Sequence, residues 1–426
     1  MGSQFAVITA LEKLNYRVTV GDVSAQSGLD FNLAQTELLN LASLTSGNMQ
    51  VSETGEIVYV FSPQIRKILR DRNFQLRVRA WLAQIWKWAF YLIRISFGIL
   101  LITSMAIVVI GIILAVIALQ SANTNDRDRN DDRGNSFEFI PNFFWIDFGN
   151  VFAPSYRRAP SQLNELDSQP KMNFLESIFS FLFGDGNPNF DLEVRRNREI
   201  SEVIRSHSGV VIAEQITPYL DQVSDKFENF EDYMIPVLSK FNGLPQVTEV
   251  GTLAYTFPEL QKVAATRTPS PKFGGYLQEN LWQFSKAGSG KITLAIALGI
   301  FYFVSALFLG SLLGQLSSSQ LGGFLGLIAA AYGLLLGYAT LFLAIPMVRY
   351  FVLQVWNHKI KEKNLKRANR ASTLATANPQ LNQKLELARE FAIAQEVITA
   401  ENLAYTTETD LNDQEYAKMF KQSPDQ

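Results

Sequence analysis

The side chains that most often do chemistry are scarce in this chain. Its 426 residues include no cysteine and only two histidines, His207 and His358. Without cysteine the chain can form no disulfide, no thiolate nucleophile and no cysteine-ligated zinc or iron–sulfur site. The two histidines lack the HExxH spacing of zinc hydrolases, which argues against a histidine-based metal site or a Ser-His-Asp triad. We therefore expect a protein that is not an enzyme and carries no cofactor or metal.

Two glycine-rich stretches resemble ligand-binding loops but lack the full patterns. FLFGDGNPN at 181–189 places Asp185 and Asn187 where a calcium loop could begin, yet the later acids and closing glutamate of an EF-hand are missing. Glycine and asparagine tolerate positive φ, so we interpret this stretch as a turn. KAGSGK at 286–291 lacks the GxxxxGK[ST] pattern of a phosphate loop and leads into an apolar run, so we assign it no nucleotide.

Tryptophans and basic residues are interleaved between residues 77 and 94, in the stretch RVRAWLAQIWKWAFYLIR. Indole rings favour the headgroup level of a bilayer, and Lys and Arg favour an anionic leaflet. We therefore predict a membrane anchor rather than a cofactor site. The anchor residues are Arg77, Arg79, Trp81, Trp86, Lys87, Trp88 and Arg94.

The elements that must position these residues are dominated by three apolar runs, in a chain that is 47% hydrophobic and 18% charged. Residues 95–119, 292–313 and 321–348 contain no charged side chain. A helix rises about 1.5 Å per residue and needs about 20 residues to cross the roughly 30 Å hydrocarbon core. We predict three transmembrane helices, the last two forming a hairpin, and no cleaved signal peptide before them.

Glycine recurs in the third run at Gly322, Gly326, Gly333 and Gly337. These spacings place small residues on one helix face, where another helix could approach closely. Glycine is also common in membrane helices generally, which is an equally good explanation. If the face serves packing, we expect it to contact the helix 292–313.

Both flanks of the membrane region are basic. Residues 64–94 carry eight Lys or Arg against one acid, and residues 349–371 carry seven against one. Basic flanks favour the cytoplasmic side, or the stroma of a plastid. Three crossings cannot place both flanks on one side. The stretch 137–153 is short for a fourth crossing and contains two acids and a proline, so we interpret it as interfacial or re-entrant.

The polar parts contain two segments with the same expected order of elements. In residues 1–63, periodic apolar residues predict helices over 5–14 and 31–44, with a short strand and a helix between them. VSETGEIVYVF at 51–61 then has the alternation and the turn glycine of a hairpin. Helix, strand, helix, helix, hairpin is the order of a winged-helix module.

Residues 194–264 repeat this order, and the similarity is greatest between VSETGEIVYVFSPQIRKI at 51–68 and VTEVGTLAYTFPELQKVA at 247–264. Tandem duplication explains this better than chance, although two unrelated hairpins with similar alternation are the alternative. The shared residues are Gly55, Tyr59, Phe61 and Pro63 in the first copy and Gly251, Tyr255, Phe257 and Pro258 in the second.

Charge argues against DNA as the partner of these modules. The expected recognition helix at 30–44 contains no Lys or Arg. Residues 1–63 hold two basic residues against six acids, and residues 194–262 hold seven against ten. Because Lys and Arg contacts to phosphate supply most nonspecific DNA affinity, nucleic acid would be repelled. We expect modules that bind proteins.

The remaining segments connect these parts. Residues 120–193 form a polar and aromatic linker whose aromatic stretches suit the headgroup level, and residues 265–291 form a second linker. Residues 372–426 hold nine acids and four bases, and 381–408 has helical periodicity. We predict an acidic helical tail, either docked on the rest of the protein or solvated.

The winged-helix-like start, the first span, the FLFGDGNPN block followed by VVIAEQITPYLD at 210–221, and the glycine-rich hairpin together resemble a family of integral membrane proteins of cyanobacteria and plant plastids. The resemblance covers most of the chain. Plant members are often labelled iron–sulfur cluster biosynthesis proteins, but a chain without cysteine cannot hold such a cluster through thiolates. The resemblance implies a thylakoid or plasma membrane with a cytoplasmic or stromal N-terminus, and it supplies no catalytic residues.

The sequence thus predicts a mainly α membrane protein with two α+β winged-helix-like soluble modules that form an internal repeat. We expect it to contact membrane lipids and other membrane proteins, and to assist assembly or maintenance of a photosynthetic membrane complex. A membrane-tethered transcription regulator is one alternative, which salt-dependent DNA binding would reveal. A transporter or channel component is the other, but spans without ionisable residues argue against it.

Overall fold

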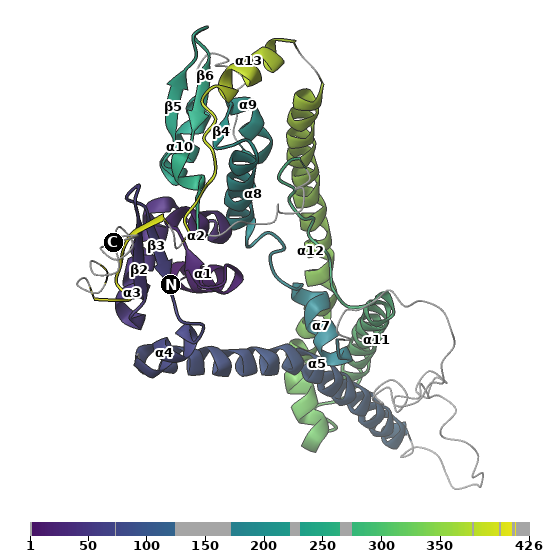
Figure 1. The fold of residues 1–426 in the computed structure, drawn as a ribbon. Coiled ribbons are helices and arrows are strands. Elements are labelled where there is room, and N and C mark those ends of the chain that lie inside the picture. The colour runs from purple at the N-terminus through teal and green to yellow at the C-terminus, as the bar shows by residue number, and fades with distance from the viewer. Residues whose placement is uncertain are drawn as a thin grey trace, which may run out of the picture. The chain divides into compact units, whose positions relative to one another are not determined.

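The structure, a computed structural model, describes residues 2–72, 74–123, 172–221, 231–264, 275–376, 379–399, 402–410 and 414. The chain is mainly helical with small sheets, and it divides into two compact units (Figure 1). Unit 1 comprises Met1–Ala83, Pro188–Leu281 and Asn357–Gln426, and unit 2 comprises Gln84–Asn187 and Trp282–Trp356. The expected interfacial segment 137–153 lies outside the described residues.

The first part of unit 1 is a small α+β module. It contains α1 (Gly2–Lys13), β1 (Arg17–Val18), α2 (Val20–Ser27), α3 (Phe31–Thr45), β2 (Asn48–Ser52) and β3 (Ile57–Val60). Thr19 and Asp22 form a capping box that starts α2, and Asp30 accepts amide hydrogen bonds that start α3. The apolar faces of the helices then bury Leu11, Leu38 and Tyr59 in one core.

The second part of unit 1 has the same order of elements. It contains α8 (Leu192–Ser206), β4 (Val210–Val211), α9 (Ala213–Ile216), α10 (Ile235–Phe241), β5 (Leu244–Val247) and β6 (Leu253–Thr256). Its sheet runs β4-β6-β5, as the first runs β1-β3-β2. Ile204, Phe241 and Phe257 are fully buried in its core.

Several backbone details recur in the two parts. Both hairpins turn at a glycine with positive φ, Gly55 and Gly251, where a Cβ would be strained. The amide of Phe61 donates to the carbonyl of Tyr16 at 2.9 Å, and the amide of Phe257 donates to the carbonyl of Gly209 at 2.8 Å. In each part this hydrogen bond joins the residue after the hairpin to the loop between the first helix and the short strand.

The same two phenylalanines each lie against a glycine. A Cβ built at Gly47 would lie 2.9 Å from the ring of Phe61, and one at Gly243 would lie 2.3 Å from the ring of Phe257. The prolines of the repeat signature are not equivalent, however. Pro63 comes two residues after Phe61 and precedes α4 (Ile65–Arg72), whereas Pro258 directly follows Phe257 and begins a 3₁₀ turn, Pro258–Leu260.

The two parts of unit 1 pack closely through α2 and α8. A Cβ at Gly28 would lie 2.7 Å from the carbonyl oxygen of Val194, and the Asn197 amide donates to the Gly28 carbonyl at 2.6 Å. The buried carboxylate of Asp22 accepts the Ala264 amide at 2.9 Å and the Arg205 guanidinium at 3.2 Å. A carboxylate with its oxygens satisfied in this way can be buried between the parts.

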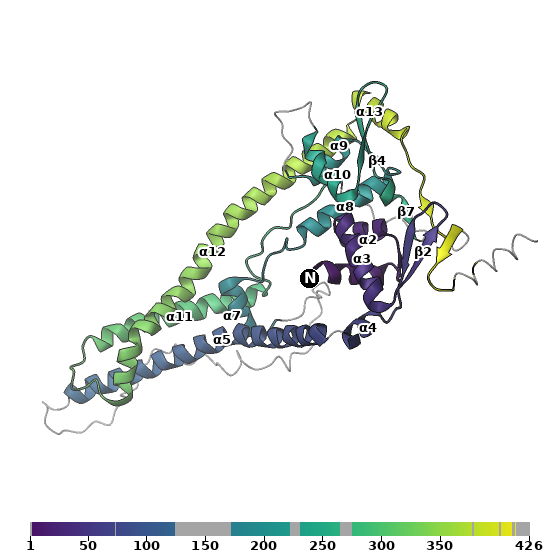
Figure 2. The same ribbon diagram turned by 90° about the vertical axis from the view of Figure 1, so that its left-hand side faces the viewer.

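The C-terminal tail docks on both parts of unit 1. Helix α13 (Pro379–Arg389) lies against β4 (Figure 2), β8 (Glu396–Val397) pairs in parallel with β7 (Lys262–Val263), and β9 (Leu403–Thr406) adds to the edge of β2. The predicted helix over 381–408 is therefore wrong beyond Arg389. Strand pairing satisfies the backbone groups there instead of helical hydrogen bonds.

Ion pairs fix α13 in place. Lys384 contacts Glu214 at 2.9 Å and Glu231 at 2.8 Å. Burial alone would lower the pKa of Lys384, but hydrogen bonds from its ammonium to the two carboxylates outweigh burial and raise that pKa. The side chain therefore stays charged at neutral pH.

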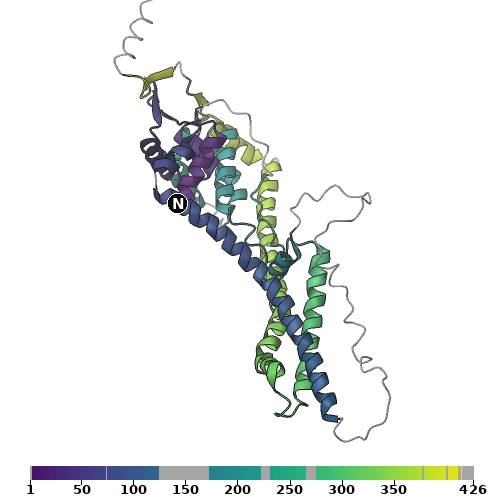
Figure 3. The same cartoon turned by 90° about the horizontal axis from the view of Figure 1, so that it is seen from below.

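Unit 2 is built from long apolar helices around one core. It contains most of α5 (Phe74–Asn123), α7 (Phe174–Phe183), α11 (Ser289–Leu313) and the first part of α12 (Gly323–Ala375), and Figures 1 and 3 show α5, α11 and α12 side by side. By length and composition, α5, α11 and α12 can each cross a membrane. The first basic flank comprises the separate helix α4 and the start of α5, whereas the second basic flank continues α12, the helix of the third apolar run.

The last part of α12 belongs to unit 1, where it carries a buried arginine. Arg367 is only 1% exposed. Its guanidinium donates to the Leu277 carbonyl at 3.1 Å, to Glu279 at 2.7 Å and to Asp221. The side-chain amide of Asn364, one turn earlier, accepts the backbone amide of Glu279 at 2.9 Å and donates to its carbonyl at 2.8 Å. This buried network fixes the end of α12 to the second part of unit 1.

We expect Arg367→Met to destabilise the protein by about 3 kcal/mol, because breaking a buried ion pair leaves the buried Glu279 carboxylate with only the exposed Lys363 ammonium, 3.8 Å away. The thermal unfolding midpoint in detergent should fall by several degrees. Lys366→Met, at an exposed neighbour, should change stability by at most about 0.5 kcal/mol. Adding Glu279→Met to Arg367→Met should restore most of the loss, and a double variant as unstable as the sum would contradict this assignment.

Candidate functional site

The FLFGDGNPN stretch begins at the end of α7, which is packed within unit 2. The Glu176 carboxylate accepts the Asn173 amide at 3.0 Å and starts the helix. Ile178, Phe181 and Leu182 are buried against the long helices. The segment expected only at the headgroup level therefore also contributes to the core. Gly184 ends the helix with a φ of 82° and turns the chain toward Asp185.

Asp185 links three segments of unit 2. Its carboxylate accepts the Ser180 hydroxyl at 2.6 Å, the Lys286 amide at 2.7 Å and the Arg94 guanidinium at 2.5 Å. These donors use the oxygen lone pairs that a cation would need. The turn thus has a structural role, and its carboxylate is a partner for the arginine that ends the basic aromatic stretch.

A second arginine, Arg349, lies on the other side of the same turn. Its Nη1 donates to the carbonyls of Ser180 at 3.3 Å and Phe181 at 3.1 Å, and its Nη2 donates to the carbonyl of Phe284. Cζ of Arg349 also lies 4.8 Å from the ring centroid of Phe284. A cation that binds the last carbonyls of a helix is stabilised by the helix dipole. Arg349 therefore caps α7.

Gly184 is required for this approach. A Cβ at Gly184 would lie 2.3 Å from Nη2 of Arg349, which is far inside van der Waals contact. A Cβ at Gly186, also at positive φ, would meet nothing within 4 Å. The two glycines of the GDG motif thus serve different purposes: both allow the turn, and only the first makes room for the guanidinium.

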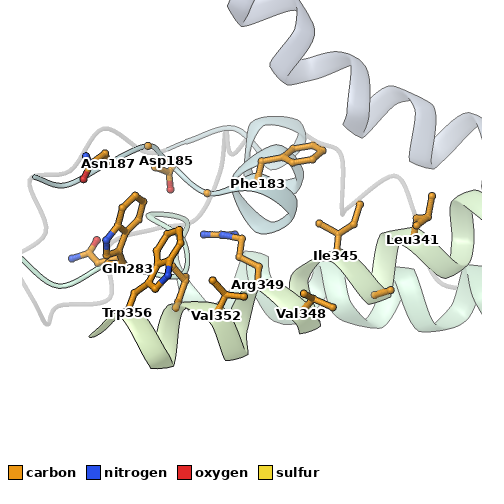
Figure 4. Close-up of a pocket in the computed structure, with 15 residues that line it drawn as sticks. Phe183, Asp185, Asn187, Gln283, Leu341, Ile345, Val348, Arg349, Val352 and Trp356 are labelled. Atoms are coloured by element: carbon orange, nitrogen blue, oxygen red, sulfur yellow. The ribbon is translucent and has the colours of Figure 1, made fainter. Parts of the chain in front are cut away.

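The turn, Arg349 and α12 surround a pocket of about 710 Å³ (Figure 4). One helix face of α12 forms its apolar wall, and Trp282 and Trp356, whose ring centroids are 5.2 Å apart, stand near its polar end. Figure 4 shows the Arg349 side chain extending from α12 toward the turn. The lining residues are Phe183, Gly184, Asp185, Gly186, Asn187, Trp282, Gln283, Leu341, Ala344, Ile345, Val348, Arg349, Val352, Leu353 and Trp356.

The predicted anchor residues all lie on α5, and Trp81, Trp86, Lys87 and Trp88 are exposed there. The side chains of Arg77 and Arg79 lie outside the described residues. Arg94 differs from the rest, because it pairs with Asp185 and lies 5.8 Å from the ring of Phe179. Sequence reasoning grouped it with the anchor because nothing local to it indicated a distant carboxylate.

The glycines predicted to pack a helix against residues 292–313 do not do so. A Cβ at Gly322, Gly333 or Gly337 would meet nothing within 4 Å, and one at Gly326 would meet only Leu321 of its own chain segment. The close approaches are made by other glycines. A Cβ at Gly299 would lie 2.7 Å from the ring of Phe342, and ones at Gly98, Gly111 and Gly310 would also crowd neighbouring helices.

Gly184→Ala should destabilise the protein more than Gly186→Ala. Both place a side chain at positive φ, a strain of order 1–3 kcal/mol. Gly184→Ala must in addition displace Arg349 from the α7 carbonyls, and hydrogen bonds of a charged group are worth about 1.5–3 kcal/mol. Thermal unfolding of the two variants in one detergent measures the difference. Equal midpoints would show that Arg349 does not depend on the missing Cβ.

Comparison with known proteins identifies a relative along nearly the whole chain. No protein-family model matches this sequence, and no solved structure matches it. An Arabidopsis thaliana protein described as "Uncharacterized protein At5g03900, chloroplastic" is 35% identical to it over 424 residues. The match covers 96% of this chain and 79% of the Arabidopsis protein. The chain therefore belongs to the same family as this chloroplastic plant protein.

Proposed function

We propose that this protein is a non-enzymatic integral membrane protein that presents two winged-helix-like modules to other proteins, and so assists assembly or maintenance of a membrane complex. The observation that carries the proposal is the combination of three apolar helices with a compact unit made of two α+β parts. The chloroplastic location of the plant relative supports a photosynthetic membrane as its site.

The two modules are best explained as copies of one winged-helix unit. Their element order and strand order agree, and Val18 pairs with Tyr59 as Val211 pairs with Tyr255. Left-handed residues also end the third helix of each part, at Ser46 and at Asn242. Unrelated hairpins would have no reason to share these features outside the strands. The similarity therefore favours duplication.

The surface of α3 suits a protein partner. Its exposed side chains include Leu33, Leu39 and Leu44 among neutral polar ones, and the half-buried Glu37 is the one charged residue of this helix. No Lys or Arg occurs on this helix, so it offers no contact to a phosphate backbone. Exposed apolar side chains among uncharged ones are typical of protein interfaces, in which charged residues are depleted at the centre.

We expect the full-length protein in nanodiscs to show no binding of duplex DNA at physiological salt in a gel-shift assay. A variant with Asn32→Lys, Thr36→Lys and Asn40→Lys on α3 should gain weak binding that falls steeply as salt rises, because added cations release counterions from DNA. Nanomolar binding by the unchanged protein would instead favour a membrane-tethered regulator.

Both basic flanks belong on one side of the membrane in this proposal. Arg94 ends the first flank and Arg349 begins the second, and both bind at the carboxyl end of α7. The soluble segments before, between and after the apolar helices also make up one compact unit, which cannot lie on both faces of a bilayer. By the positive-inside rule, that side is the cytoplasm or stroma.

The path of the chain within unit 2 agrees with this orientation. Helix α5 ends at Asn123, yet Leu175 lies beside Gly98, about 37 Å back along the helix for 25 residues at 1.5 Å each. Lys291, near the start of α11, also binds the carbonyl of Met172. Asn123 and Leu175 therefore lie at opposite ends of the apolar part of α5, with Leu175 at the end next to the basic flank.

Single cysteines test this topology without background, since the chain contains none. Ser43→Cys, Ser206→Cys and Ser372→Cys place thiols at exposed sites of the three segments of unit 1. We expect all three to react with an impermeant maleimide from the same side. Ser318→Cys, in the turn between α11 and α12, should react only from the other side. Labelling of Ser43→Cys and Ser206→Cys from opposite sides would refute the orientation.

A further inference from the structure

We propose that the pocket beside Arg349 is a specific site for a lipid with an anionic head group, whose acyl chain lies along α12. This rests on the proposal that the protein spans a membrane. The site lies entirely within unit 2, and on one side of Arg349 the α12 residues that line it are all apolar.

The apolar wall on one side of Arg349 runs along one face of α12. Leu341, Ile345 and Val348 recur at intervals of four and three residues, which places them on that face. From Leu341 to Val348 the helix rises about 10 Å. In a hydrocarbon core of roughly 30 Å, this is about two thirds of the depth that the chains of one leaflet fill.

The polar end carries an excess of positive charge. Arg349 and the carboxylate of Asp185 line this end, and Arg94, which pairs with Asp185, lies behind them. The charge of Asp185 also acts on Arg349, so two guanidinium groups against one carboxylate leave one net positive charge, while Arg349 donates its hydrogen bonds to carbonyls. A partly buried cation of this kind attracts an anion strongly, because the surrounding dielectric is low. A phosphate or sulfonate head group would supply the missing charge.

The pocket suits a bilayer lipid better than a soluble anion. Most of its lining is aliphatic or aromatic, and one wall is formed by α12, a helix that we assign to the membrane. Trp282 and Trp356 stand beside the charged end, where indole rings mark the headgroup level. Asn187 and Gln283 add polar side chains at that same end. The apolar wall thus lies on one side of Arg349, and the tryptophans and polar side chains lie on the other.

The test uses the full-length protein, purified in detergent and incubated with phosphatidylglycerol or phosphatidylcholine, with bound lipid counted by native mass spectrometry. Ala344→Phe fills the apolar wall, and Ala330→Phe adds the same bulk at an exposed position of α12 outside the pocket. We expect the unchanged protein and Ala330→Phe to retain phosphatidylglycerol in preference to phosphatidylcholine. Ala344→Phe should lower the affinity for phosphatidylglycerol about tenfold or more.

A second variant removes the positive charge at position 349 and leaves the apolar wall of the pocket unchanged. Arg349→Gln retains an amide that can donate to the α7 carbonyls, and it should abolish the preference for phosphatidylglycerol while leaving some binding of both lipids. This result decides the case if Ala344→Phe fails to fold. Equal retention of both lipids by the unchanged protein would show ordinary bilayer contact and overturn the proposal, as would undiminished binding by folded Ala344→Phe.

Two control measurements distinguish a lipid site from a soluble-anion site and from a loss of membrane insertion. Millimolar inorganic phosphate should not displace bound phosphatidylglycerol, since it cannot fill the apolar wall; complete displacement would show a site for a soluble anion and overturn the lipid assignment. Extraction of cell membranes with alkaline carbonate, applied to all variants, reports membrane insertion alone. If the unchanged protein stays in the membrane but shows no lipid selectivity, this site alone is refuted, whereas release of the unchanged protein from the membrane refutes the proposed function.

Discussion

A buried positive charge must be surrounded by acceptors, and Arg367 imposes this constraint on unit 1. It belongs to the helix that leaves the last apolar run, yet its partners Asp221 and Glu279 come from the segment before that run. The charge can be buried only if these segments assemble, so their folding is coupled. The tail that follows then continues along the same unit and pairs with strands from both modules. Much of unit 1 therefore depends on one guanidinium group.

The tail adds a strand to the sheet of the first module but not to the sheet of the second, and a single residue explains this difference. Met49 of β2 donates its amide to the Thr407 hydroxyl at 2.8 Å and accepts the Thr407 amide at 2.9 Å. In the other module the residue at this register is Pro245, since Met49 is opposite Tyr59 and Pro245 is opposite Tyr255. Proline has no amide hydrogen, so it cannot accept an added strand in this way. The tail therefore extends the first sheet and contacts the second module through α13 instead.

Sequence reasoning located the features that depend on local pattern. The three apolar runs, the hairpins and the turn glycines Gly55 and Gly251 follow from periodicity and from the need for positive φ. Sequence reasoning failed where residues far away in the sequence determine the local structure. The stretch around Val397 has helical periodicity, but β7 offers it a strand to pair with. The glycines of the third run share a face, but no bulky neighbour lies there. Arg94 and Arg349 were counted as flanking charge, because only the fold brings Asp185 and the end of α7 to them.

These two arginines also remove the conflict between the basic flanks. In the sequence they stand at opposite ends of the apolar region, and counting three crossings sets their flanks on opposite sides of a membrane. In unit 2 they meet at one short helix, α7, whose last carbonyls accept Arg349 and whose following carboxylate accepts Arg94. A 10-residue helix is too short to cross a bilayer, but it can gather charges that must stay at the same depth. In the proposed orientation, the short helix α7 therefore holds both arginines at one level, and both basic flanks satisfy the positive-inside rule.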